Sequence, residues 1–354
     1  ATVVVAAVLI VTLCWLLGDF EMRRTREFTR VVARSIGKQR AGISTHADPF
    51  EHCKDVVKRG DYDGYLYSLL QGPERRPAAL VIRAFNVETA SIKDAVRGNV
   101  MPGRMRMQWW KDCMADIFAG EPPPQPVALA LADVVSKQGT GRLLTRRWFD
   151  RLLDARMADL EITQPETLEQ MEMYAENTAS SLLYLSLEVA GIRAGEVPNA
   201  AAIGHVAGHV GKAVGVCTLL RSLAQPPPQG MGFVESCVLP AEVMRRHLLS
   251  HSVLNKGPQT PKEAHALAEC VFDVASVAKG HMEAAEEGLA AVMEETGGRL
   301  PARAFAALLP GVRVAWYLET LMMCGFDAFD ETLRPQSPFK FQLRLAKALI
   351  TEKF

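Results

Sequence analysis

Helical periodicity without strand alternation is the feature that most constrains the fold of this chain. From Asp48 onward, apolar residues recur every three or four positions, as in Val271, Val274 and Val277. Alternation of apolar and polar residues, which marks half-buried strands, does not extend over a useful length. Alanine, leucine, glutamate, arginine and methionine dominate the long segments, and these residues favour helix. The sequence therefore predicts an all-α fold.

Proline and glycine clusters divide this region into segments. Residues 121–126 and 225–230 are proline-rich and predict loops, as do Gly297 and Gly298 followed by Pro301. We expect helices near residues 57–70, 76–97, 104–119, 126–137, 145–159, 167–191, 199–223, 240–250, 261–295, 301–323 and 338–351. Composition does not change along these segments, so residues 48–354 are expected to form one large helical domain.

The first 47 residues differ from this domain. Residues 2–18 carry no charge, and about 17 apolar residues is the lower limit for spanning a bilayer. A transmembrane anchor, a secretory signal and a buried core helix are the three alternatives. A signal carries its positive charges before the apolar run, whereas here the arginines follow it. We therefore expect a transmembrane anchor at residues 1–20, a basic linker or helix at 21–47, and a body on the cytosolic or matrix side.

Charge argues against a nucleic-acid-binding protein, and cysteine usage argues against a disulfide-linked framework. The chain has 40 basic and 40 acidic residues, so it lacks the basic excess of a nucleic-acid-binding protein. Its seven cysteines form no CxxC pair. An odd number of scattered cysteines in a long chain predicts reduced, mostly buried thiols.

Four segments are distinctive as an ordered set. They are Arg83-Ala-Phe-Asn-Val-Glu-Thr-Ala-Ser-Ile-Lys-Asp94, Arg104-Met-Arg-Met-Gln-Trp-Trp-Lys111, residues 174–191 (YAENTASSLLYLSLEVAG) and residues 209–221 (HVGKAVGVCTLLR). In this order and spacing they resemble the squalene/phytoene synthase family. They are most similar to its divergent branch, which acts in the assembly of mitochondrial respiratory complex I. Residues 317–330 also resemble that branch. The resemblance implies an isoprenoid-synthase-like helical domain.

The resemblance also implies a metal-dependent reaction in the enzymes of the family. They join two prenyl diphosphates head to head, with Mg²⁺ held between two Asp-rich helical motifs. Hard cations such as Mg²⁺ prefer carboxylate oxygens, and acids four residues apart share one helix face. Counted from Phe85, the three aspartate positions of the first motif fall on Ala90, Ser91 and Asp94. One carboxylate of three remains.

The second motif has lost its acids completely. Arg221 matches the family arginine, and the residues after it are Ser222-Leu-Ala-Gln-Pro226. A single aspartate cannot hold a metal cluster against two diphosphates, because Mg²⁺ gives up its water reluctantly. We therefore expect a protein without prenyl-condensing activity, without a metal and without a cofactor.

The positions that remain predict a positively biased former cleft. Arg221 and Lys212 lie on the helix that lost its acids, and Asp154 lies on a helix that in the enzymes carries polar residues. We expect Asp94 to form a salt bridge with these cations across the cleft. An anionic lipid headgroup is the alternative partner for Arg221 and Lys212.

Two further patterns have a structural and a functional interpretation. The pairs His205/His209 and His247/His251 have the i, i+4 spacing of helical Zn²⁺ ligands, but no third ligand is evident, so structural or solvated histidines are expected. Arg104, Arg106 and Lys111 with Trp109 and Trp110 form a basic aromatic patch. It predicts either an amphipathic helix with partly buried tryptophans or a contact with a partner or membrane.

Three functions follow from these observations. The first is a non-catalytic assembly factor or accessory subunit of complex I, at the mitochondrial inner membrane with its body facing the matrix. The second is a lipid- or isoprenoid-binding protein that uses the apolar cleft of the fold. The third is a prenyltransferase with altered metal ligands. The emptied motifs favour the first, with complex I subunits, the inner membrane and a bound lipid as expected partners.

Overall fold

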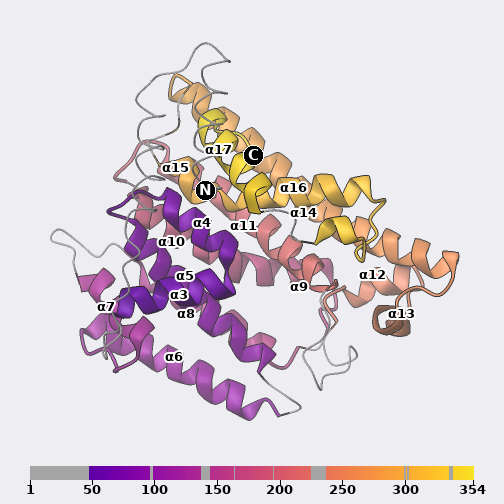
Figure 1. Cartoon of the computed structure of the whole chain (residues 1–354), viewed down its shortest axis with the longest axis horizontal. Coiled ribbons are helices and arrows are strands. Elements are labelled where there is room, and N and C mark those ends of the chain that lie inside the picture. Colours follow the sequence, from indigo (N-terminus) through magenta and orange to yellow (C-terminus); the bar gives the residue numbers. More distant parts are fainter. Residues whose placement is uncertain are drawn as a thin grey trace.

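Helices form all the regular structure in the described part of the chain, as the computed structural model shows (Figure 1). The structure describes residues 48–95, 99–136, 144–162, 164–193, 195–224, 237–298, 300, 303–334 and 338–354. The helices are α3 (Pro49–Gly60), α4 (Tyr62–Leu70), α5 (Arg76–Asp94), α6 (Met101–Ala119), α7 (Pro126–Ser136), α8 (Arg146–Asp159), α9 (Leu168–Ala175), η1 (Glu176–Ser180), α10 (Ser181–Ala190), α11 (Ala200–Ser222), α12 (Ala241–Arg246), α13 (His251–Lys256), α14 (Pro261–Glu295), α15 (Ala304–Leu308), α16 (Pro310–Met323), η3 (Glu331–Leu333) and α17 (Pro338–Thr351). The all-α prediction is confirmed.

The predicted anchor at residues 1–20 and the basic segment at 21–47 lie outside the described residues. Among the residues that are described, α11 is the one helix long and apolar enough to cross a bilayer. More than half of its apolar window is buried inside the fold, and it packs against α9, α10, α14, α15 and α16. Helix α11 is therefore a core helix.

Small residues allow α11 to approach its neighbours closely. A Cβ atom added to Gly211 would lie 2.4 Å from the Cα atom of Ser180, and one added to Gly215 would lie 2.8 Å from the Cα atom of Ala175. Ala175 ends α9, and Ser180 ends the single π-helical turn η1 that joins α9 to α10. The two glycines therefore set the separation between α11 and the α9–η1–α10 helix.

Three buried apolar clusters surround this arrangement. One gathers around Phe85 and Phe149 from α5 and α8, one around α11, α14 and α16, and one around α10, α11, α15 and α17. The six cysteines in the described part of the chain are free thiols, and all except the partly exposed Cys324 are buried. This agrees with the thiol state expected from the sequence.

Most helix predictions agree with the structure, and three need correction. The helix expected at residues 240–250 ends at Arg246, and a separate short helix, α13, follows from His251 to Lys256. The helix expected at residues 57–70 is two helices, because Asp61 leaves helical geometry with φ −146° and ψ 72°. The helix expected at 301–323 is also two, with Pro310 as the first residue of α16. A proline lacks the N–H that would continue the preceding helix.

Candidate functional site

The break between α3 and α4 places two acids at the centre of the molecule. The Asp61 side chain accepts a hydrogen bond of 2.8 Å from the Gly64 amide, which caps the start of α4. Its other carboxylate oxygen lies 3.4 Å from the Arg83 guanidinium of α5. Asp61 therefore both begins α4 and joins it to α5.

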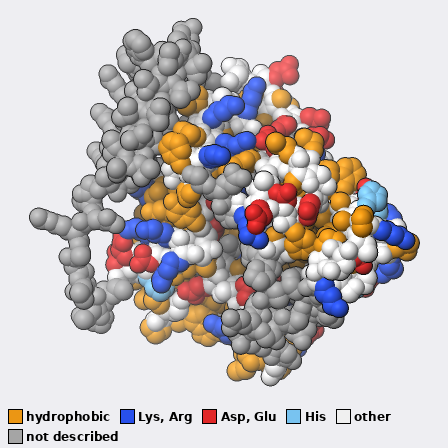
Figure 2. All heavy atoms as spheres, turned by 45° about the vertical axis from the view of Figure 1, so that its right-hand side comes forward, with side chains coloured by type: hydrophobic (Ala, Val, Ile, Leu, Met, Phe, Trp, Pro, Cys, Tyr) orange, Lys and Arg blue, Asp and Glu red, His pale blue; other side chains and the backbone are white. Residues whose placement is uncertain are grey.

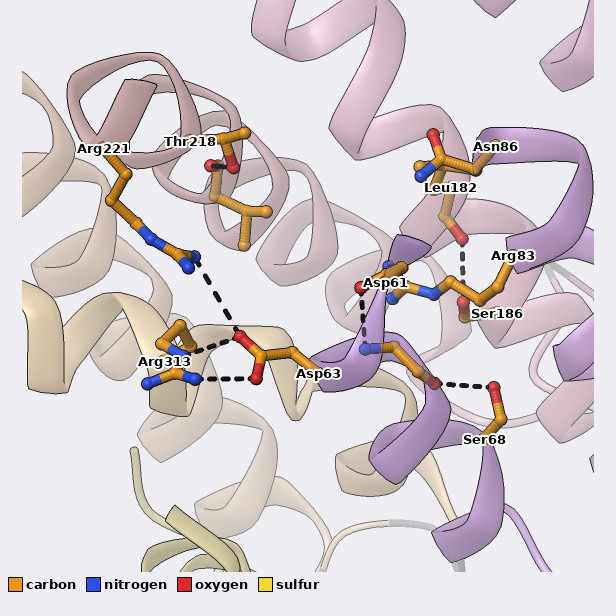
Figure 3. Close-up of polar contacts among 12 residues, drawn as sticks. Asp61, Asp63, Ser68, Arg83, Asn86, Leu182, Ser186, Thr218, Arg221 and Arg313 are labelled. Atoms are coloured by element: carbon orange, nitrogen blue, oxygen red, sulfur yellow. Dashed lines mark hydrogen bonds and ion pairs between the residues drawn. The ribbon is translucent and has the colours of Figure 1, made fainter. Parts of the chain in front are cut away.

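Asp63, the second residue of α4, contacts two arginines from distant parts of the chain. Its carboxylate accepts hydrogen bonds of 2.7 and 2.6 Å from Nε and Nη2 of Arg313 on α16. The Arg221 guanidinium of α11 lies 4.0 Å from the same carboxylate (Figure 3). The side chains of Asp63 and Arg313 are each 20% exposed, so this bidentate pair is only weakly screened by water.

A small hollow lies beside this pair, with a volume of about 30 Å³. That volume holds one or two water molecules. It is lined by three arginines, two threonines and three apolar or aromatic residues: Arg221, Arg313, Trp316, Tyr317, Thr320, Thr332, Leu333 and Arg334. The hollow is too small for a prenyl chain.

The three first-motif positions lie in the last turns of α5. Ala90 and Ser91 are exposed, and the Ser91 hydroxyl donates to the Glu88 carbonyl oxygen at 2.9 Å. Asp94 is the last residue of the helix. Nearby protein atoms remove part of its carboxyl group from water and raise its pKa, while the cations of Lys93 and Arg156 act in the opposite direction.

Arg156 of α8 is the buried cation closest to this end of α5. It is 8% exposed and donates to the Asn86 carbonyl oxygen at 3.1 Å and to Asn86 Oδ1 at 2.7 Å. It also bonds to the Thr89 hydroxyl. Burial lowers the pKa of Arg156, because it removes water from around the guanidinium charge. The hydrogen bonds to Asn86 and Thr89 replace part of that lost hydration.

The residues predicted to share a cleft make separate contacts. Lys212 lies 3.7 Å from Glu176 of η1, and Asp154 lies 2.6 Å from Lys111 of α6, at a position 60% exposed. Arg221 faces Asp63 instead of Asp94. The predicted salt bridge from Asp94 to Arg221 or Lys212 is therefore wrong in its partners. Asp61 and Asp63 of α4 supply acids to this region that were not expected from the sequence.

These residues do not fit a magnesium cluster. Ala90, Ser91 and Ser222 carry no carboxylate. Among the described residues, no group of three or more His, Cys, Asp or Glu side chains is placed to hold a metal ion. Asp61 and Asp63 direct their oxygens at arginines. A guanidinium excludes a cation by its charge.

The structure separates the members of two further sequence patterns, the His247/His251 pair and the basic aromatic patch. His247 and His251 do not share a helix, because α12 ends at Arg246; His247 lies 2.9 Å from Asp273 of α14. In the aromatic patch, Trp110 is 4% exposed and packs edge-on against Phe85. Trp109 is 41% exposed. One tryptophan thus belongs to the core and the other to the surface.

Sequence reasoning missed Asp61, Asp63 and Arg313. The pattern Asp-Tyr-Asp followed by glycine was a signal for a helix start, since aspartate is a frequent N-cap. Arg313 gave no local signal, because its partner lies 250 residues away in the chain.

Comparisons with known proteins agree with this geometry. The squalene/phytoene synthase family model matches residues 57–343. A Bos taurus protein named NADH dehydrogenase (ubiquinone) complex I, assembly factor 6 is 35% identical over 80% of this chain and 77% of its own length. The Rattus norvegicus protein of the same name is 34% identical over 89% and 86%. A solved dehydrosqualene synthase has a TM-score of 0.65 at 19% identity, covering 85% of this chain and 95% of its own.

Proposed function

Because the chain belongs to the squalene/phytoene synthase family, we propose that it is a non-catalytic member of that family that acts in the assembly of respiratory complex I. The relatives at 35% and 34% identity carry the name of a complex I assembly factor. The observation that carries the non-catalytic part is the ion-pair network on α4. Asp63 holds Arg313 at 2.6 Å and faces Arg221 at 4.0 Å.

The charges of this network support the proposal that the chain is not catalytic. Departure of a diphosphate needs its negative charge to be neutralised, which metal ions supply in the family. Here Arg221 shares the Asp63 carboxylate with Arg313. An incoming diphosphate would have to displace that carboxylate or approach it against like charge. The retained Arg221 thus already faces a carboxylate within the fold.

Incubation with farnesyl or geranylgeranyl diphosphate and Mg²⁺ tests the non-catalytic assignment. We expect no condensation product and no pyrophosphate above a protein-free blank. An active squalene synthase run in parallel shows that the assay works. A condensation product that disappears in Asp94→Ala would refute the assignment.

Loss of the protein from cells tests the assembly role. We expect mature complex I to fall and smaller assembly intermediates to accumulate on native gels, and the full chain to restore it. Co-purification after mild detergent extraction then separates two roles. An assembly factor is recovered with intermediates, whereas an accessory subunit is recovered in equal amount with the mature complex. A normal level of complex I in the null cells would contradict both roles.

Membrane attachment through residues 1–20, with the body in the matrix, is part of this proposal. Residues 2–18 carry no charge, and several arginines follow them. Positively charged flanks stay in the compartment from which a segment inserts, which here is the matrix. Alkaline extraction of mitochondria tests it. The full chain should stay in the pellet, and a chain that starts at residue 21 should be released.

The lipid-binding alternative has less support from the described residues. The hollow beside Arg221 has a volume of about 30 Å³. A second, wider hollow of about 910 Å³ is lined largely by charged residues of α8, including Arg146, Asp150 and Arg151. Neither offers the apolar lining expected for an isoprenoid. Mass spectrometry of the natively purified protein would reveal a stoichiometric lipid.

A further inference from the structure

Three histidines and a glutamate form a continuous row where α9, α11 and α14 meet. His205 and His209 lie one turn apart on α11, and their Nε2 atoms are 3.3 Å apart. The Nδ1 atom of His209 lies 3.0 Å from Nδ1 of His281 on α14. The Nε2 atom of His281 lies 2.6 Å from Oε1 of Glu172 on α9. The row runs from an exposed histidine to a carboxylate.

Glu172 determines where the protons lie along this row. An ionised carboxylate only accepts hydrogen bonds, so Nε2 of His281 donates to it. In neutral His281, Nδ1 then carries a lone pair, and Nδ1 of His209 donates to it. Neutral His209 is left with a lone pair on Nε2, directed at Nε2 of His205. The row therefore leaves the lone pair of His209 Nε2 on the side that faces His205.

The two Nε2 atoms have the separation of metal ligands. Zn²⁺ binds imidazole nitrogen at about 2.0–2.1 Å with tetrahedral angles, which places two ligand nitrogens about 3.3–3.4 Å apart. The observed separation is 3.3 Å. Metal-bound histidines usually donate their second N–H to an acceptor that fixes the ring. His281 and Glu172 form such a support for His209.

We propose that His205 and His209 bind a Zn²⁺ ion through their Nε2 atoms, with His281 and Glu172 orienting His209. Two imidazoles select a borderline ion such as Zn²⁺ over Mg²⁺ or Ca²⁺. His205 is exposed, so the ion reaches the site from solvent. The remaining coordination positions are taken by water or by a side chain of a partner. This site is separate from the Asp63 network and does not rest on the proposed function.

The surroundings of the site are compatible with a bound cation. Lys212, three residues after His209 on α11, has the Glu176 carboxylate 3.7 Å from its ammonium group.

Zinc titration of the full-length protein tests this site. The protein is freed of metal with a chelator, desalted and titrated with Zn²⁺ against a coloured zinc indicator. We expect one Zn²⁺ per chain and a rise in Tm on binding. His205→Ala should weaken binding at least tenfold, and Glu172→Gln about 10- to 100-fold.

His265→Ala is the matched control. His265 lies on α14, the helix that carries His281, but outside the row. Its side chain is 77% exposed and lies near Glu269. This variant should bind Zn²⁺ like the wild type. His205 is exposed, so its replacement leaves the fold intact even if Glu172→Gln does not fold. Wild-type affinity in His205→Ala, or no stoichiometric Zn²⁺ in the wild type, would overturn the proposal.

Discussion

Asp63 accepts two hydrogen bonds from Arg313 and faces Arg221, so one carboxylate is opposed by two guanidinium groups. Arg313 also lies over the Phe341 ring, 3.9 Å from its centroid. A cation held between a carboxylate and an aromatic face is fixed in both position and charge. Removal of the carboxylate would leave two poorly hydrated cations near each other.

Asp63→Asn should therefore destabilise the fold by about 1–3 kcal/mol, because it removes the negative charge and replaces one of the two acceptor oxygens with an NH₂ donor that faces a cation. Urea unfolding followed by circular dichroism measures this change. Glu51→Gln is the control. It removes the partner of Lys54 in a pair where Glu51 is 63% exposed, and should cost at most about 0.5 kcal/mol. Equal effects of the two substitutions would show that the α4 network adds no stability.

Asp273 gives the fold a pH dependence. Partial burial raises the pKa of its carboxyl group, but hydrogen bonds from His247 and Arg246 outweigh burial and hold it below 3.8. A folded-state pKa below the unfolded one gives stability that is present above the unfolded value and lost as the pH falls through the folded value. The pair should thus stabilise the protein at pH 7 and fade below about pH 4.

Asp273→Asn checks this sign. The variant should have a lower urea midpoint than the wild type at pH 7, and the difference should shrink as the pH falls below 4. Glu283→Gln, on the same helix and 57% exposed, should follow the wild type at every pH. A difference between Asp273→Asn and the wild type that grows in acid would contradict the assigned direction.

Residue identity predicted the loss of acids but not the new partners. Ala90, Ser91 and Ser222 followed from the resemblance to the synthase motifs, counted from Phe85 and Arg221, because a motif position is a local property of the sequence. The partner of Arg221 did not follow, since Asp63 is brought within reach of the Arg221 side chain only by tertiary packing, such as that of α4 against α16. The same applies to His281 and Glu172, which lie on two other helices from His209.

At the scale of elements, α11 is held close to its neighbours by glycines. Gly215 faces Ala175, where an added Cβ would lie 2.4 Å from the alanine Cβ and 2.8 Å from its Cα. Backbone atoms cannot move aside as a flexible side chain can. Gly204 lies on the same helix with no atom within 4 Å of an added Cβ. A comparison of alanine substitutions at Gly215 and Gly204 therefore distinguishes the effect of packing from that of helix propensity.

Gly215→Ala should destabilise the protein by about 1–3 kcal/mol through overpacking. Gly204→Ala should stabilise it by about 0.5–1 kcal/mol, because alanine loses less backbone entropy in a helix. Thermal and urea unfolding of both variants measures the contrast. Stabilisation by both substitutions would mean that α11 and α9 are not in close contact at Gly215.

Helix positions were largely predictable, whereas helix breaks were not. Periodicity and proline placed helices such as α14, whose start at Pro261 follows the N-cap Thr260. The break at Asp61 follows from a side-chain cap that competes with continuation of the helix. The π turn η1 lies opposite the glycines of α11, and periodicity carries no information about such tertiary contacts.

At the scale of the whole molecule, the chain has a synthase-like fold in which Asp61 and Asp63 pair with arginines of other helices. The wider hollow on α8 and the small one beside Arg313 are both lined by ionised side chains. Acidic and basic side chains are interspersed among hydrophobic ones on the face seen in Figure 2. This mixture agrees with the zero net charge and favours recognition of proteins over polyanions.

Asp94→Ala tests whether the remaining motif acid has a catalytic use. Asp94 is exposed at the end of α5, so its removal should change the stability by no more than about 0.5 kcal/mol. If the protein acts without catalysis, Asp94→Ala should restore complex I in null cells as well as the wild type does. Gly211→Leu, which forces a large side chain against Ser180, provides a misfolded control at the same expression level. Failure of Asp94→Ala to restore complex I, at wild-type abundance, would show that this carboxylate still acts and that the fold has kept part of its chemistry.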